Sequence, residues 1–534
     1  MKKRILSLIL ALGLLVTMAG VTAYAETPTA IQHDIAAGSV VINDCGAECP
    51  GHVIFGEVSD FTGHNIKILS GSHKVTLRDL YVLNSYPSEY NETTIPEYSV
   101  IYVADGVSRV DFTFEGYCGF NSEHGLYSLA DETNFYGTED SKINFSGHYE
   151  GAFIKNDLTV SGGSFGASVS AYDDSDPHKP HSYALTVGGT LTVSDAELDF
   201  SCLGYFENQR YPGGAEDDLA LCALKTKKLV AKNSVIEART DEVYADDGIF
   251  SRNYGIFVSS DATLEDCWLK AKAENATVSA GLVCHGALKA TSSYIDATSG
   301  LGDNISNGII ALSIDAEESE IVGESRGEVE AFGIFTSAVK VKGGLISGLA
   351  EAENAAANVG IFLIAPASFT LTDANIVAKG KTADVMAKDT NFAGVVYKAD
   401  ENAAPVVKAA ADIDGYFGNR HKLIYDANGV DAEMPEGREY YSYQEFYVSD
   451  EKPTADGYMF LGWHRIPDGK GETIDPERRL TLEDGDLVLY AQWKKLETPP
   501  TGDNSAVLPW AVVAAVCLSF LTAVFVYRKK CSVK

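Results

Sequence analysis

Apolar residues in the centre of the chain recur with a period of about 26 residues. A glycine followed by an apolar residue stands at Gly255, Gly281, Gly308, Gly333 and Gly360, at intervals of 25 to 27 residues. A second ladder follows these glycines, and its anchor residues are Leu158, Leu191, Leu229, Ala262, Leu288, Ile314, Val339 and Phe369. A repeat of this length is typical of solenoids, in which each unit packs on the next one.

The offsets from each anchor predict two short strands that meet at a corner. The anchor and the residue two positions later are apolar, as expected for one face of a strand. The residue seven positions later is apolar again, but the one five positions later breaks the parity, so the chain must turn before it. That position is small in every copy: Gly163, Ala196, Ser234, Cys267, Ser293, Ser319, Gly344 and Ala374. We therefore predict an all-β fold with a parallel β-helix over residues 61–400, preceded by a cap region at 26–60.

This pattern resembles the right-handed parallel β-helix proteins of the pectin-lyase-like type. The resemblance implies a right-handed coil whose repeats stack their ladders one above another. The fold carries lyases, hydrolases, adhesins and inert stalks, so by itself it does not define a function.

Residues 420–494 follow a linker at 401–419 and have a different pattern. Three motifs occur in order: Tyr425-Asp426-Ala427-Asn428-Gly429, Gly457-Tyr458-Met459-Phe460-Leu461-Gly462-Trp463 and Leu489-Tyr490-Ala491-Gln492-Trp493. They closely resemble the Listeria–Bacteroides repeat, the internalin B-type repeat with a β-grasp fold. The resemblance implies a cell-surface spacer or interaction module.

The rings of this small domain have two interpretations. Tyr425, Phe460, Trp463, Tyr490 and Trp493 are its largest side chains, and we predict that they form its core. The alternative is an exposed sugar-stacking platform that contains Trp463 and Trp493.

The N-terminus has the pattern of a secretory signal peptide over residues 1–25. Lys2-Lys3-Arg4 precedes an apolar run, and Ala23 and Ala25 form a small-residue exit before Glu26. The alternative is an N-terminal membrane helix.

The C-terminal segment, residues 495–534, predicts attachment to the cell envelope. Residues 507–527 are apolar and long enough for a transmembrane helix, and a basic tail follows. The preceding Pro499, Thr501 and Gly502 resemble the sortase signal L-P-x-T-G, although Thr498 replaces the leucine. The resemblance implies cleavage after Thr501 and its attachment to peptidoglycan, which would make the protein extracellular and cell-wall-anchored after a membrane-bound stage. The alternative is a plain membrane anchor.

Charge and cysteine content narrow the possible partners. The chain has 75 acidic and 42 basic residues, a formal charge of −33. Such a surface repels phosphate backbones and excludes nucleic acid as a partner.

Cys45 and Cys49 lie close together before His52, a spacing that fits a loop disulfide, free thiols or part of a metal site.

The anchor spacing predicts three loops that form one binding surface. Spacings of 33, 38 and 33 residues precede spacings of 26, 26 and 25, and a coil of fixed perimeter must extrude the excess. Rings and charged groups are common at recognition surfaces. We predict that a glycan or a host or bacterial surface protein is bound by Tyr205, Tyr211, Tyr244, Asp246 and Asp247. The alternative is three independent insertions.

The first of these loops also contains a cluster of carboxylates and imidazoles. A divalent cation could be held by Asp173, Asp174, Asp176, His178 and His181. The alternative is a solvated acidic loop.

No motif for nucleophilic catalysis or for a cofactor occurs in the sequence. The predicted function is therefore adhesion or ligand binding on a β-helix. A polysaccharide lyase or glycoside hydrolase is the alternative, and it would need a carboxylate pair drawn from Asp217, Asp218, Asp246 and Asp247. A passive surface stalk is the third possibility.

Overall fold

The computed structural model describes residues 30–44, 49–59, 63–84, 98–171, 181–204, 219–241, 251–274, 276–300, 302–352, 356–497 and 507–531. The chain divides into two compact units, Met1–Gly418 and Asn419–Lys534. The division falls at the end of the segment that the sequence predicts as a linker.

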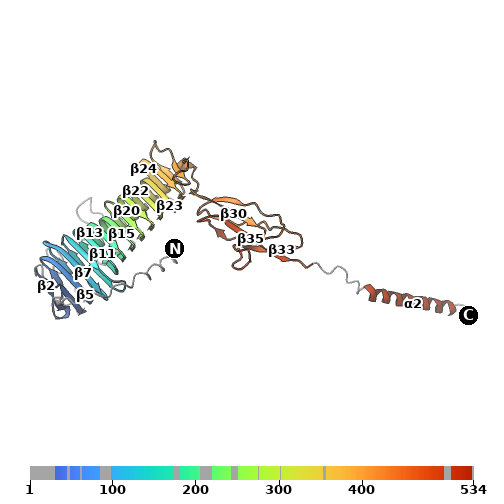
Figure 1. The fold of residues 1–534 in the computed structure, drawn as a ribbon, viewed down its shortest axis with the longest axis horizontal. Helices are drawn as coiled ribbons and strands as arrows, with labels where there is room; N and C mark the ends of the chain where they lie inside the picture. Colours follow the sequence, from blue (N-terminus) through green and yellow to red (C-terminus); the bar gives the residue numbers. More distant parts are fainter. Residues whose placement is uncertain are drawn as a thin grey trace, which may run out of the picture. The chain divides into compact units, whose positions relative to one another are not determined.

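The first unit is one sheet of 29 strands, joined almost throughout by parallel pairing. Figure 1 shows these strands stacked in chain order, from β2 and β5 to β24. The strands are β1 Ile31–Asp34, β2 Val40–Ile42, β3 His52–Val58, β4 Ile66–Ile68, β5 Gly71–Leu83, β6 Ser99–Val103, β7 Val107–Glu115, β8 Tyr117–Ser128, β9 Glu132–Tyr136, β10 Lys142–Ile154, β11 Asp157–Ser161, β12 Ser164–Ala171, β13 His181–Ser194, β14 Glu197–Gly204, β15 Leu219–Lys232, β16 Val235–Thr240, β17 Ser251–Val258, β18 Ala262–Glu265, β19 Trp268–Ala273, β20 Ala276–Thr291, β21 Tyr294–Ser299, β22 Gly302–Ser325, β23 Glu330–Ala350, β24 Ala357–Thr372, β25 Asn375–Lys379, β26 Ala383–Ala387, β27 Val395–Lys398, β28 Val406–Lys408 and β29 Tyr416–Phe417.

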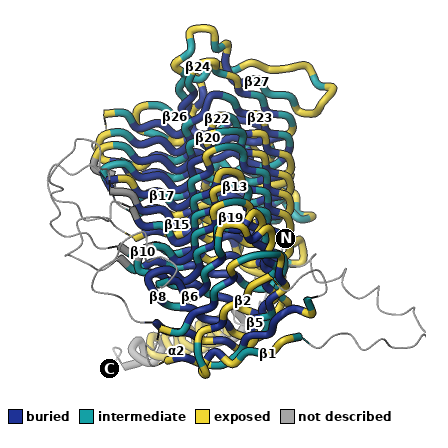
Figure 2. Tube along the Cα trace, turned by 90° about the vertical axis from the view of Figure 1, so that its left-hand side faces the viewer, coloured by how far each residue is buried: buried dark blue, intermediate teal, exposed yellow. Residues whose placement is uncertain are grey.

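The register of the sheet follows the sequence repeat. Leu158 pairs with Leu191, Leu191 with Leu229, and the series continues through all eight anchors to Phe369. The residues seven positions after the anchors pair in the same way, from Phe165 to Ile376. Both ladders are buried (Figure 2). This is the pairing predicted for a parallel β-helix.

The predicted corner lies at one residue of each repeat. The residue four positions after the anchor has a left-handed backbone, with φ of 52° at Asp195, 53° at Asp266 and 49° at Ser292. The small residue that follows bonds to the next coil: Cys267 N donates to Ser293 Oγ, and Ser293 N donates to Ser319 Oγ, each at 3.0 Å. The small residues therefore form a hydrogen-bonded file, which we call the corner file.

The repeated glycines lie where two walls of the coil meet. A Cβ at Gly281 would lie 2.6 Å from the backbone nitrogen of Thr298, and a Cβ at Gly255 would lie 2.7 Å from that of Lys272. Because both obstructions are backbone atoms, no side-chain movement would relieve them. The 26-residue glycine period thus reflects close contact between backbones rather than turns.

The parallel pairing extends beyond the predicted start, and antiparallel pairing appears at the other end. β1 already pairs with β3 within the region predicted as a cap, and β2, also in that region, pairs with β4 beyond it. At the C-terminal end β28 pairs antiparallel with β27, and β29 pairs antiparallel with β25.

The second unit contains a mixed sheet of four strands in the order β31-β30-β35-β33. The central strands β30 and β35 are parallel, while both outer pairs are antiparallel. The unit also contains a separate antiparallel pair of strands, β32 and β34. The bounds are β30 Arg420–Asp426, β31 Arg438–Tyr441, β32 Phe446–Tyr447, β33 Tyr458–His464, β34 Arg479–Leu480 and β35 Leu487–Lys495.

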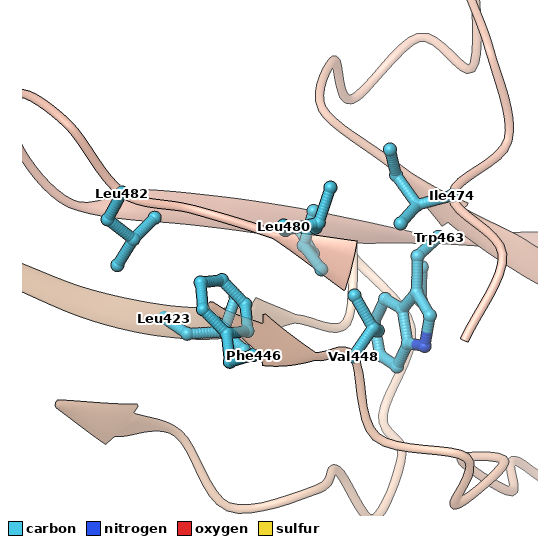
Figure 3. Packing of buried hydrophobic residues seen from close by; sticks show 9 residues of the cluster. Leu423, Phe446, Val448, Trp463, Ile474, Leu480 and Leu482 are labelled. Atoms are coloured by element: carbon cyan, nitrogen blue, oxygen red, sulfur yellow. The ribbon is translucent and has the colours of Figure 1, made fainter. Parts of the chain in front are cut away.

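Trp463 belongs to the buried hydrophobic cluster that forms the core of this unit, where it lies near Val448 and Ile474 (Figure 3). It is 1% exposed, and the centre of its ring lies 4.7 Å from that of Tyr425 and 5.0 Å from that of Phe460. Trp493 packs against this cluster, and its Nε1 donates to the carbonyl of Ala427 at 2.8 Å. The core interpretation of both tryptophans is confirmed.

Tyr490 differs from its predicted place in the core. It is half-buried and lies outside the packed cluster, whereas its neighbours Leu489 and Ala491 are fully buried. Side chains alternate along a strand, so Tyr490 faces away from the core that its neighbours line.

The C-terminal helix is α2, Val507–Cys531. Within the part of the chain that the structure describes, no helix is long and apolar enough to cross a membrane. The predicted transmembrane helix is therefore not supported.

Candidate acid–base cluster and aromatic strip

The residues that precede the repeated glycines form a further ladder on the sheet. His124, before Gly125, pairs with Glu150, before Gly151. Glu150 pairs with Tyr183, and the ladder continues through Cys222 to Tyr254. The repeat therefore brings titratable side chains from β8, β10 and β13 onto adjacent strands.

Glu150 is the centre of what we call the acid–base cluster, which consists of His124, Glu150, Tyr183, Thr186 and Lys225. The Thr186 hydroxyl donates to Glu150 Oε1 at 3.2 Å, and His124 Nδ1 lies 3.9 Å from Glu150 Oε2. The Glu150 side chain is 18% exposed and that of His124 is 3% exposed. The carboxyl group therefore has limited access to solvent.

Burial shifts the pKa values of the two groups in opposite directions. It raises the pKa of Glu150 to about 7, although the hydrogen bond from Thr186 and the charge of Lys225 partly counteract it. It lowers the pKa of His124 to about 4. At neutral pH the imidazole is uncharged and the carboxyl group is near its midpoint, a state that suits proton transfer.

Lys225 connects the cluster to an aromatic ring. Its Nζ donates to the Tyr183 hydroxyl at 3.3 Å and lies 4.4 Å from the centre of that ring. Burial raises the pKa of Tyr183, so the hydroxyl stays protonated.

A strip of mostly aromatic and apolar side chains runs along the same strands and includes Thr186 and Lys225 of the acid–base cluster. Its members pair in register from coil to coil, and we call them the aromatic strip: Tyr102, Tyr127, Phe153, Thr186, Lys225, Phe257, Val283, Ile310, Phe335, Phe362 and Met386. The rings of Tyr127 and Phe153 stack at 4.6 Å, and those of Phe335 and Phe362 stack at 5.4 Å. Most members are half-buried, whereas Val283 and Phe362 are buried.

The predicted ligand-binding residues Tyr205, Tyr211, Tyr244, Asp246 and Asp247 lie outside the described residues. So do Asp217 and Asp218, as well as Asp173, Asp174, Asp176 and His178; His181 begins β13, and its side chain is not described. Pro499, Thr501 and Gly502, and Ala23 and Ala25, also lie outside. In the sequence, however, the three predicted loops directly precede β13, β15 and β17, three of the strands that carry the cluster and the strip.

One group of possible metal ligands occurs among the described residues. Cys49, His52 and His73 place a ligand atom each within 4.8 Å of the others. Cys49 is disulfide-bonded, which excludes a free thiol at this residue, and Cys45 lies outside the described residues. Burial and the neighbouring His33 and His73 lower the pKa of His52 to about 4, so its imidazole is uncharged at neutral pH.

Cys267 fills the role predicted for it. It is a free, buried thiol in the corner file, and burial raises its pKa. Such a thiol packs as a small apolar side chain and is unreactive.

Sequence reasoning missed Glu150, His124 and Lys225. These residues could have been found from their positions in the repeat. His124 and Glu150 each directly precede a repeated glycine. Lys225 lies two residues after Ala223, the alanine at the equivalent position. The carboxylates predicted for catalysis lie in loops, whereas Glu150 lies on the strand β10 and occurs in one coil.

Comparison with known proteins identifies one segment. Residues 421–492 match the Listeria–Bacteroides repeat domain, within the predicted 420–494. No curated protein and no solved structure matches the chain.

Proposed function

We propose that this chain is an extracellular surface protein that binds carbohydrate through the aromatic strip and the acid–base cluster. The observation that carries the proposal is the register of half-buried rings beside polar groups. A sugar ring presents apolar C–H faces that stack on aromatic rings, and hydroxyl groups that need hydrogen-bond partners. Tyr127 and Phe153 would supply the stacking surface, while Glu150 and Lys225 would supply the polar contacts.

Surface location is supported by the repeat domain at 421–492, a type found in extracellular and surface proteins. We propose further that residues 1–25 direct export and that Pro499, Thr501 and Gly502 are read by a sortase, which joins Thr501 to peptidoglycan. The predicted loops, with Tyr205, Tyr211 and Tyr244, would extend the binding surface.

The test is a glycan-array screen of residues 26–497, followed by titration of the glycans that bind. In a Tyr127→Ala/Phe153→Ala variant we expect the affinity to fall by roughly tenfold or more, because loss of a central aromatic contact costs above 1 kcal/mol. The matched control is Trp268→Ala/Tyr294→Ala, which removes a ring pair at 4.3 Å on β19 and β21 instead. An equal loss in both variants, or no loss in the first, would contradict the proposed surface.

A second candidate function is polysaccharide cleavage, and the raised pKa of Glu150 favours it. A carboxyl group that is near its midpoint at pH 7 can act as a general acid or base. A reducing-sugar release assay on the same glycans tests this function. Enzymatic activity should be lost in Glu150→Gln, whereas a pure binding protein would release no sugar in either form.

A further inference from the structure

Three histidines on three successive strands of the stack form a column at the N-terminal end of the sheet. His33 lies on β1, His52 on β3 and His73 on β5. The ring centres of His33 and His52 are 5.3 Å apart, and those of His52 and His73 are 5.7 Å apart. His52 and His73 are buried, at 6% and 3% exposure. β1 pairs with β3 and β3 with β5, and each histidine is offset by two residues from the partner of the next one, so the rings lie diagonally across paired strands.

Cys49 adds a sulfur atom at the distance that a metal site requires. Its Sγ lies 3.6 Å from His52 Nε2. With Zn–S near 2.3 Å and Zn–N near 2.05 Å, a tetrahedral angle places the sulfur and nitrogen ligands about 3.6 Å apart. The two atoms thus already have the separation of two corners of a zinc tetrahedron. His73 also places a ring nitrogen within 4.8 Å of the Cys49 sulfur and of a ring nitrogen of His52.

The hydrogen bond of His73 fixes its tautomer, and that of His52 is compatible with a lone pair on Nε2. His73 Nε2 donates to the carbonyl of Ser70 at 2.6 Å, and an imidazole in this tautomer has its lone pair on Nδ1. His33 Nε2 and His52 Nδ1 are 3.0 Å apart; if His52 Nδ1 donates, its lone pair is on Nε2, toward Cys49. Metal-bound histidines typically donate their second N–H to a carbonyl or another acceptor in this way.

We propose that His52 Nε2, His73 Nδ1 and the thiolate of Cys49 form a zinc site that opens when the disulfide of Cys49 is reduced, with His33 as a positioning residue. A dithiol reductant supplies two electrons and two protons to the disulfide, giving two thiols, and is itself oxidised to its disulfide. Zinc then displaces the proton of the Cys49 thiol and binds the sulfur. Three protein ligands leave a fourth position for water. The redox state of Cys49 thus controls the occupancy of the site.

The test uses tag-free full-length protein with Cys517→Ser and Cys531→Ser as the background, and Co²⁺ as a spectroscopic probe followed by displacement with Zn²⁺. After reduction we expect one equivalent of Co²⁺ to bind, with tetrahedral d–d bands and a thiolate-to-cobalt charge-transfer band. The oxidised protein should bind at least tenfold more weakly and lack the charge-transfer band. Equal affinity in both redox states, or binding without that band, would overturn the proposal.

Variants assign the ligands. Cys49→Ser should abolish the charge-transfer band, and His52→Ala and His73→Ala should each weaken Co²⁺ binding by at least tenfold. His285→Ala, at an exposed histidine on β20, is the matched control and should bind like the background protein. Because His52 and His73 are buried, each variant is checked by circular dichroism. As a measurement that needs no core substitution, alkylation of reduced Cys49 with iodoacetamide should also abolish the band, and an unchanged band would refute the site.

Discussion

Glu150 Oε1 accepts a 3.2 Å hydrogen bond from the hydroxyl of Thr186, across the pairing of β10 with β13. A hydroxyl donor stabilises the charged form of the carboxyl group, yet burial outweighs it and raises the pKa. The Glu150 carboxyl group therefore gains or loses its proton near neutral pH.

Replacing this acid should make the protein more stable at high pH. The pKa of Glu150 is about 7 in the folded chain, against 4.5 for the free group. Between these values the unfolded chain has lost its proton while the folded chain keeps it, so stability falls as the pH rises. Below pH 4.5 this effect should not change the free energy of unfolding of Glu150→Gln relative to wild type. Above pH 7 the free energy of unfolding of the variant should be higher by about 3 kcal/mol.

Urea unfolding at pH 4 and pH 8 measures this difference. Glu197→Gln, at an exposed position on β14, which pairs with β12 and β16, is the control and should change little at either pH. A pH-independent difference between wild type and Glu150→Gln would show that the carboxyl group has an ordinary pKa.

The corner file should not tolerate a large side chain. Ser293 accepts a hydrogen bond from Cys267 and donates its own N–H to Ser319, within a buried stack. Ser293→Trp should cost about 1–3 kcal/mol in free energy of unfolding because it overpacks the corner. Ala374→Trp should act similarly, whereas Thr263→Trp, at a half-buried position between the inward residues of β18, should cost less. Thermal melting of the three variants would decide the matter.

The repeated glycines should not tolerate a larger residue either. Gly281→Ala places a methyl group 2.6 Å from the backbone nitrogen of Thr298, which should cost about 3 kcal/mol. The reciprocal control is Ala223→Gly, in a coil that already holds a methyl group at this position; it should cost about 1 kcal/mol. Similar unfolding midpoints for wild type and Gly281→Ala would mean that the walls can move apart.

The sorting motif gives a prediction about attachment. If Thr501 is joined to peptidoglycan, boiling detergent should not extract the protein from cells until the wall is digested. Thr501→Ala should become extractable by detergent alone. Identical extraction of wild type and variant would rule out a covalent wall link.

The sequence predicts the repeat well because each coil must satisfy the same packing constraint. All eight anchors, from Leu158 to Phe369, pair as predicted, and the parity break at the corner file locates the turn. Features that occur once are harder to predict, as Glu150 shows: its significance depends on His124 and Thr186, on the two flanking strands. The prediction for Tyr490 is wrong for a local reason. The large ring suggested a core residue, but the alternation of side chains along β35 places it on the face away from the core. The right-handed coil and the loop residues Tyr205 and Asp246 stay predictions.

The antiparallel strands at the end of the sheet have a consequence for assembly. A stack of parallel coils ends in unpaired N–H and C=O groups, to which another chain could add and so extend a filament. Here β28 covers β27 in the opposite direction, is only three residues long and directly follows Pro405. Short edges and proline discourage further pairing. The C-terminal end of the sheet is thereby protected against end-to-end polymerisation.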